Sequence, residues 1–155
     1  MTMISIHIVT LMAALSAAAI TGCSGTGADE DQGEPIAGEA EALTRSGFSS
    51  YNIYKGVPAT SVKCDLKPER FNLMVTAIRH DIFSTTPNIC HKCVRVTHDG
   101  KSVTVRVIDE SNDFTSNNGQ RKLDMAPEAF RKIGSIAAGS IPVTFQFVSC
   151  PAALD

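Results

Sequence analysis

The chain of 155 residues contains no tryptophan, and aromatic residues make up only 6% of it. A broad surface of stacked aromatic rings is therefore excluded, so any polysaccharide affinity from such stacking should be weak. Long helical patterns are also missing, which excludes a helical bundle, and internal repeats are not apparent. No nucleic-acid-binding motif is present, and we expect no nucleic-acid partner.

Lysine and arginine are absent from the first 42 residues. Residues 24–42 carry six acids among several glycines and alanines, a composition that cannot bury enough apolar surface to offset chain entropy. We therefore interpret residues 23–43 as a disordered acidic tether. The rest of the chain holds all 14 Lys and Arg against 10 acids, although the whole chain has a net charge of −2. This basicity fits an anionic wall polymer, but it is also common in domains that bind nothing acidic.

The longest apolar run, Ile4 to Ala19, is short for a membrane span and lies where a secretory signal has its apolar region. It ends in Ala19-Ile-Thr-Gly-Cys23, which resembles a bacterial lipobox. We expect residues 1–22 to be an export signal and Cys23 to be acylated, which would anchor the chain to a membrane. The expected location is the cell envelope or the exterior. An ordinary cleavage site with an incidental cysteine is the alternative.

Four other cysteines remain, at positions 64, 90, 93 and 150. An even number in an exported chain favours two disulfides, for which three pairings are possible. A redox Cys-x-x-Cys motif normally opens a helix, yet Cys93 leads into a strand-like segment. A zinc site would need all four cysteines to converge, or a histidine such as His91. We therefore expect two disulfides, no metal and no cofactor.

Alternating apolar and polar residues predict strands at 94–98 and 103–107, and the Asp99-Gly100 pair between them favours a type I′ hairpin turn. Further strands are expected at 48–54, 72–78 and 143–149. A short helix is expected at 127–133, with Pro127 in its first turn and Gly134 as its C-cap. Ser111 to Gln120 is expected to be a solvated loop. A calcium loop is the alternative there, but the spacing of its oxygen ligands does not fit. Together these patterns indicate a small all-β or β-rich barrel with one short helix.

Several segments resemble the barwin proteins and the first domain of expansins. They are Cys90-His-Lys-Cys93-Val-Arg-Val, Val-Ile-Asp109, Leu-Asp124-Met with Ala129-Phe130, and Phe-Val-Ser-Cys150. The resemblance runs from Ser46 to Cys150 and implies that residues 44–155 form a six-stranded double-psi β-barrel, a fold shared with rare lipoprotein A. It also implies that Cys64 pairs with Cys90, and Cys93 with Cys150. Proteins of this fold do different things, so the fold alone does not decide the function.

In expansins, a threonine of a Gly-x-x-Thr-Tyr segment and two aspartates line a groove that contacts wall glycan. The matching segments here are Gly47-Phe-Ser-Ser50-Tyr51, Val-Ile-Asp109 and Leu-Asp124-Met. The resemblance therefore implies that Ser50, Tyr51, Asp109 and Asp124 bind the ligand. Ser111 replaces an aromatic residue that bacterial expansins carry two positions after the first aspartate.

Each aspartate could instead be structural, Asp109 as an acceptor at a strand end and Asp124 as a residue at a helix entry. A partly buried carboxylate near another one could have a raised pKa and act as a general acid. Asp124 and Asp109 are therefore the candidates for catalysis, although neither is assigned as catalytic.

The resemblance favours a monomeric domain that binds cell-wall polysaccharide or peptidoglycan without hydrolysing it. A lytic transglycosylase like rare lipoprotein A is the enzymatic alternative. The Glu-Arg-Tyr-Asp segment and histidine of that family are matched only in part, by Glu69-Arg-Phe-Asn72 and His80. A secreted module of the protease-inhibitor type is the third possibility, with residues 85–88 as its contact loop.

Overall fold

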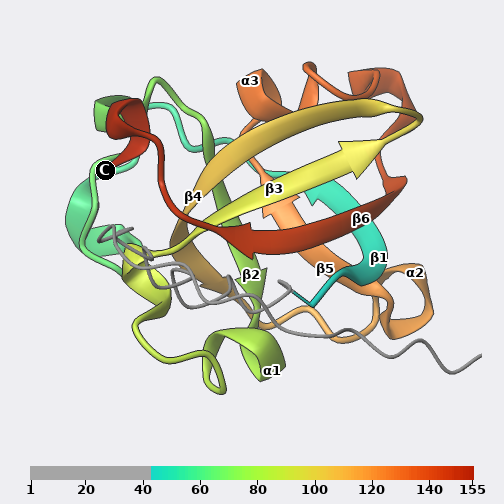
Figure 1. Cartoon of the computed structure of the whole chain (residues 1–155), viewed down its shortest axis with the longest axis horizontal. Helices are drawn as coiled ribbons and strands as arrows, with labels where there is room; N and C mark the ends of the chain where they lie inside the picture. Colours follow the sequence, from blue (N-terminus) through green and yellow to red (C-terminus); the bar gives the residue numbers. More distant parts are fainter. Residues whose placement is uncertain (1–42) are drawn as a thin grey trace, which may run out of the picture. The chain divides into compact units, whose positions relative to one another are not determined.

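The computed structural model describes residues 43–155. The expected export signal, the lipid site at Cys23 and nearly all of the expected tether therefore lie outside the described residues. Six strands close into a barrel in the order β1-β5-β2-β4-β3-β6 (Figure 1). The strands are β1 Arg45–Tyr51, β2 Val75–Arg79, β3 Cys93–His98, β4 Lys101–Ser111, β5 Arg121–Met125 and β6 Ile141–Val148.

The helices are all short and lie in the connections between strands. They are α1 His80–Phe83, α2 Ser116–Gly119 and α3 Pro127–Phe130, with 3-10 turns at η1 Ala59–Ser61, η2 Pro68–Phe71, η3 Ile89–His91, η4 Ile136–Ala138 and η5 Ala152–Leu154. Figure 1 shows α3 and α1 at opposite ends of the barrel in that view.

Two strand pairs are parallel, β1 with β5 and β2 with β4, and the other four pairs are antiparallel. Parallel neighbours cannot be joined by a tight turn, so each of these pairs needs a crossover connection. The closed barrel of six strands, with few short helices and two disulfides, confirms the expected fold class.

The β3–β4 hairpin forms as expected. Asp99 and Gly100 both have left-handed backbone, with φ of 45° and 75°, as a type I′ turn requires. Val94, Val96 and Val105 are completely buried, so the alternating pattern points one side of each strand into the barrel.

Other boundaries differ from the expectations. β1 begins at Arg45 and ends at Tyr51, and β2 begins only at Val75, because Asn72 and Leu73 have left-handed backbone with φ of 51° and 58°. The expected helix at 127–133 ends at Phe130, and residues 116–119 of the expected loop form α2. β5 was not among the strands given bounds from the sequence, and Asp124 lies within it rather than at a helix entry.

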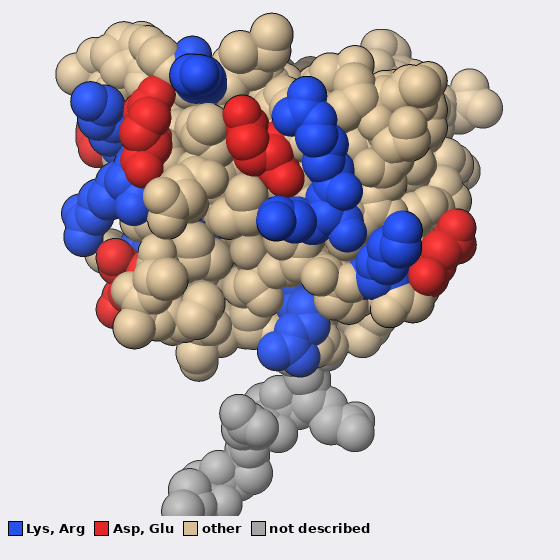
Figure 2. Space-filling model, turned by 90° about the horizontal axis from the view of Figure 1, so that it is seen from above, with Lys and Arg blue, Asp and Glu red and all other residues tan. Residues whose placement is uncertain are grey.

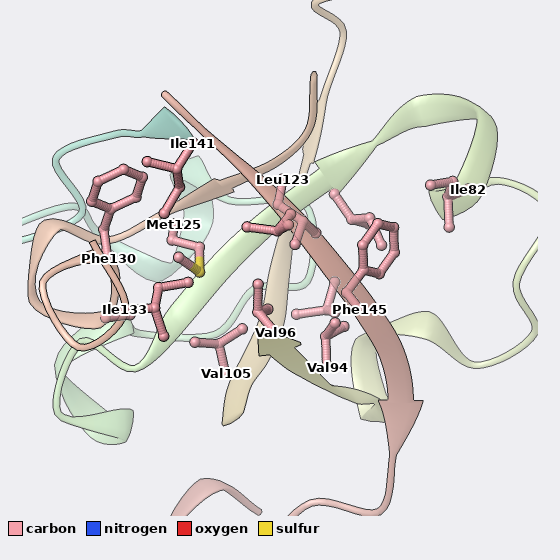
Figure 3. Close-up of a cluster of buried hydrophobic side chains, with 14 of the residues drawn as sticks. Ile82, Val94, Val96, Val105, Leu123, Met125, Phe130, Ile133, Ile141 and Phe145 are labelled. Atoms are coloured by element: carbon pink, nitrogen blue, oxygen red, sulfur yellow. The ribbon is translucent and has the colours of Figure 1, made fainter. Parts of the chain in front are cut away.

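The barrel interior is filled by aliphatic and aromatic side chains from all six strands and from α3. Figure 3 shows this cluster, in which Val96, Val105, Leu123, Met125, Phe130, Ile133, Ile141 and Phe145 point toward one another. A second cluster contains Tyr54, Phe71, Val75, Ala77, Ile108 and Leu154, among other residues. The apolar side chains on the outer face of β2 and β4 are therefore covered by the segment after β1 and by the C-terminal turn.

The two disulfides join Cys64 to Cys90 and Cys93 to Cys150, which confirms the expected pairing. Arg106, only 4% exposed, reinforces the same region. It donates hydrogen bonds to the carbonyl oxygens of Leu154 and Cys90, each at 2.9 Å. The C-terminal turn is consequently held against the barrel by a disulfide and by a buried guanidinium.

Candidate functional site

Four residues from neighbouring strands form one row across the barrel wall. Ser50 of β1 is in register with Asp124 of β5, Asp124 with Ala77 of β2, and Ala77 with Asp109 of β4. Paired residues lie on the same side of a sheet, so the two predicted aspartates flank the small Ala77. Two strand spacings separate their Cα atoms by about 10 Å. We call Ser50, Asp124, Ala77 and Asp109 the acid row.

Irregular strand pairing accompanies this row. The register of β1 with β5 shifts between Phe48 and Ser49, and that of β2 with β4 shifts between Thr76 and Ala77. A bulge turns the side chains that follow it to a new direction, and such bulges are frequent beside functional sites. The shift in β2 lies immediately before Ala77, and the shift in β1 lies one residue before Ser50.

Asp124 is largely enclosed, with 14% of its side chain exposed. The Ser50 hydroxyl donates to Asp124 Oδ1 at 2.8 Å and accepts from Arg121 Nη1 at 3.0 Å. Arg121 also pairs with Asp113 at 2.6 Å. Burial raises the pKa of Asp124, while the Ser50 hydrogen bond and the Arg121 charge act in the opposite direction. Burial dominates, so this carboxyl holds its proton to a higher pH than an ordinary aspartate.

Asp109 has a different environment. Its Oδ1 accepts hydrogen bonds from the backbone N–H groups of Lys63, at 3.0 Å, and Glu110, at 2.9 Å. An open cavity of about 390 Å³ lies beside it, lined by Thr60, Ser61, Val62, Lys63, Glu110 and Asn112. The two amides fix the orientation of the carboxylate at the edge of a polar groove.

Tyr54 belongs to the same site, although the sequence reading did not single it out. The side chain is buried, and burial, followed by the negative charges of Asp109 and Asp124, raises the pKa of its phenol. The hydroxyl therefore stays protonated and lies within the electrostatic reach of both acids. Arg121 and Asp113 were also missed. The spacing of three positions between Arg121 and Asp124 was the only sequence signal that Arg121 lies near the site.

Tyr51, the fourth predicted ligand residue, lies away from the row. It is in register with the buried Met125 and packs edge-on against Phe130, with ring centroids 5.4 Å apart. The structure thus brings Ser50 and Asp124 into contact and sets Asp109 across Ala77, but it turns Tyr51 toward α3. A ligand-binding role for Tyr51 stays a prediction.

Glu69 and His80, which partly match the lytic pattern, are bonded elsewhere. Glu69 Oε1 accepts a hydrogen bond from the Gly56 N–H at 2.6 Å, and this bond lowers the pKa of Glu69. His80 Nδ1 lies 2.7 Å from Glu110 Oε1. Neither side chain is hydrogen-bonded to Ser50, Asp109 or Asp124.

A separate cavity of about 620 Å³ lies over β1, β6 and the β3–β4 turn and contains no residue of the acid row. Figure 2 shows cations and acids intermingled on one face, without a continuous surface of a single charge. Within residues 43–155, no group of three or more His, Cys, Asp or Glu is placed to hold a metal ion. No helix in this part of the chain is long and apolar enough to span a membrane.

Comparison with known families matches residues 69–145 to a family described as lytic transglycolase. A search of curated proteins finds no significant match. Among solved structures, the chain is similar to the apo expansin of Clavibacter michiganensis, with a TM-score of 0.58 and 24% identity over 71% of this chain and 52% of that one. This chain thus spans about half the length of that expansin.

Two further structures show the same fold. An aspartate-to-asparagine variant of the Clavibacter michiganensis expansin, in complex with cellohexaose, has a TM-score of 0.57 and 22% identity over 71% of this chain and 52% of that one. The Streptomyces papain inhibitor has a TM-score of 0.52 and 25% identity over 68% of this chain and 94% of that one. The chain therefore carries a double-psi β-barrel domain, similar to those of expansins and of the lytic transglycolase family.

Proposed function

We propose that this chain is an expansin-like domain that binds a cell-wall polysaccharide or peptidoglycan across the acid row and does not cleave it. The observation that carries the proposal is the enclosed Asp124 carboxyl, which Ser50 holds in place and which the small Ala77 separates from Asp109. The similar expansin solved with cellohexaose supports a glycan as the ligand.

The row suits a sugar chain because its polar atoms are oriented before the ligand arrives. Ser50 and two backbone amides hold the carboxyl groups of Asp124 and Asp109, so little side-chain freedom would be lost on binding. Sugar hydroxyls both donate and accept hydrogen bonds. The carboxyl oxygens of Asp124 and Asp109 can therefore accept hydrogen bonds from the sugar, while Ala77, which separates them, and Tyr54 are buried.

The lytic alternative has two observations in its favour, the matched family description and the raised pKa of Asp124, which would suit a general acid. The position of its expected partners counts against it. Glu69 is bonded to Gly56 and His80 to Glu110. In the described part of the chain, no second acid or imidazole is hydrogen-bonded to Asp124 to act with it.

The inhibitor alternative draws support from the Streptomyces papain inhibitor, whose length this chain nearly covers. The loop at residues 85–88 is braced, because the hydroxyls of Thr85 and Thr86 donate to the carbonyl oxygens of Asp81 and Ile82 at 2.6 and 2.7 Å. In that case the ligand would be a protein, and the acid row would play no part.

The proposal includes export and attachment to the cell envelope. Residues 1–22 would be removed, Cys23 would carry the lipid, and residues 23–43 would tether a monomeric domain to the membrane. The intact mass of the mature protein from its native host would show whether Cys23 is acylated.

The test of function is a pelleting assay of the full chain with insoluble peptidoglycan and cellulose. We expect Asp124→Ala to lower the affinity about tenfold, because it removes a desolvated carboxyl of the row. Glu69→Ala serves as the matched control and should bind like wild type, because Glu69 is bonded to Gly56 and not to the acid row. Mass spectrometry of the supernatant should find no anhydro-sugar products.

Two results would contradict the proposal. Release of anhydro-sugars that stops in Asp124→Ala, with the fold intact by circular dichroism, would make the protein a lytic enzyme. Unchanged affinity in Asp124→Ala would remove the acid row from the function and favour the inhibitor.

A further inference from the structure

Phe114 is an aromatic side chain that lies outside the buried core of the barrel. It is 48% exposed, and the other large exposed apolar side chains of the described chain, Leu43 and Ile53, are aliphatic. A single exposed apolar residue is common and by itself needs no explanation. The surroundings of Phe114 are what make it informative.

The ring of Phe114 is held in a defined orientation. The Arg79 guanidinium lies over it, 5.7 Å from the ring centroid, and the His80 ring meets it edge-on at 6.3 Å. Arg79 is itself fixed, because its Nε donates to Asp81 Oδ1 at 2.8 Å and its Nη1 donates to the Gly119 carbonyl oxygen. One face of the ring therefore rests on an immobilised cation, and the exposed half of the side chain faces solvent.

The backbone around Phe114 is tied to the acid row. Asp113 pairs with Arg121 at 2.6 Å, and Arg121 donates to the Ser50 hydroxyl at 3.0 Å. Arg79, beneath the ring, follows Ala77 by two positions on β2 and is in register with Ser111. Residues two apart on a strand share a face and lie about 7 Å from each other. Phe114, packed on the Arg79 guanidinium, is therefore linked to the acid row through both Arg79 and Asp113.

We propose that Phe114 is the stacking platform for one pyranose ring of the glycan that the acid row holds, an inference that rests on the proposed function. The C–H face of a β-linked hexopyranose packs against a flat aromatic ring, and its equatorial hydroxyls remain free to reach Asp124 and Asp109. The two tyrosines near the row are turned inward, Tyr51 onto Phe130 and Tyr54 into the second core cluster. Phe114 is therefore the aromatic side chain that this site presents to a ligand.

The absence of tryptophan makes a direct test possible. In full-length Phe114→Trp the new indole is the only tryptophan, so its emission reports on this position alone. We expect titration with cellohexaose to shift that emission and to give a Kd within about twofold of the calorimetric wild-type value, because a flat ring is retained.

Non-aromatic variants separate stacking from simple apolar contact. Phe114→Leu keeps an apolar side chain over Arg79 but removes the flat face, and Phe114→Ala removes both. We expect each variant to raise the Kd for cellohexaose about tenfold, the change that loss of one aromatic contact produces. Ile53→Ala, which shortens another exposed apolar side chain, is the matched control and should bind like wild type. Thermal unfolding should be nearly unchanged in all of them, because Phe114 lies outside the core.

The outcomes distinguish this inference from the proposed function. Wild-type affinity in Phe114→Leu would reject the stacking role. So would a constant indole emission in Phe114→Trp while calorimetry shows binding. Either result would leave glycan binding at the acid row intact. Absence of any cellohexaose or peptidoglycan binding by wild type would reject both. Equal losses in Ile53→Ala and Phe114→Leu would show a general effect of exposed apolar area and would also overturn the inference.

Discussion

At Asp124, burial opposes ionisation more strongly than Ser50 and Arg121 favour it, so its pKa lies above the ordinary value of 3.8. Between the unfolded and folded pKa values, the native state binds more protons than the unfolded state. The stability that this proton contributes is complete below pH 3.8 and is lost as the pH rises through the folded pKa. Asp124→Asn cannot ionise. We expect it to gain stability relative to wild type as the pH rises through this window.

Urea unfolding at a series of pH values measures the effect, and Asp113→Asn is its control. Hydrogen bonds from Ser116 and Thr115 lower the pKa of Asp113, so its contribution is present above pH 3.8 and is lost on acidification. The Asp113→Asn variant should therefore be less stable than wild type near neutral pH, and the difference should shrink in acid. A pH-independent difference for Asp124→Asn would show that burial does not control this carboxyl.

Among the elements, the parallel pair β1–β5 assembles the site, and Gly47 sets how closely the two strands approach. A Cβ atom at Gly47 would lie 2.4 Å from Lys122 Cγ and 2.8 Å from the Gln120 carbonyl oxygen. The lysine stem could move, but that carbonyl accepts the Phe48 N–H at 2.9 Å and belongs to the backbone. We expect Gly47→Ala to cost about 1–3 kcal/mol in urea unfolding, as overpacking typically does.

The same variant should weaken glycan binding, because displacement of β5 moves Asp124 away from Ser50. Ser46→Ala is a suitable control, since its side chain is exposed on the same strand. A Gly47→Ala protein with wild-type stability and affinity would mean that β5 tolerates the shift.

For the molecule as a whole, the two disulfides restrict the unfolded chain to different extents. Cys93–Cys150 spans 57 residues and Cys64–Cys90 spans 26. Loop-closure entropy predicts contributions of about 4 and about 3.5 kcal/mol. Removal of Cys93–Cys150 also loosens the C-terminal turn that Arg106 binds. We therefore expect Cys93→Ala with Cys150→Ala to lower the free energy of unfolding more than Cys64→Ala with Cys90→Ala does. The reverse order in urea unfolding would contradict this.

Much of the fold could be predicted from local patterns. The Asp99-Gly100 turn and the valines that flank it specify the β3–β4 hairpin, because positive φ angles and a period of two are properties of adjacent residues. The even number of cysteines indicated two disulfides. Their pairing, and the prediction that Asp109 and Asp124 are site residues, came from resemblance to a known family rather than from any local rule.

Only the tertiary structure decided how the site is assembled. Ser50 and Asp124 are 74 positions apart and meet through a parallel strand pair that no local pattern reveals, since β5 has only Leu123 and Met125 as inward apolar residues. The same holds for Tyr54, which feels the charges of both acids, and for Phe114 on Arg79. Sequence by itself determines which chain segments extend and turn. Long-range register determines which side chains share a face, because it depends on packing contributed by the whole barrel.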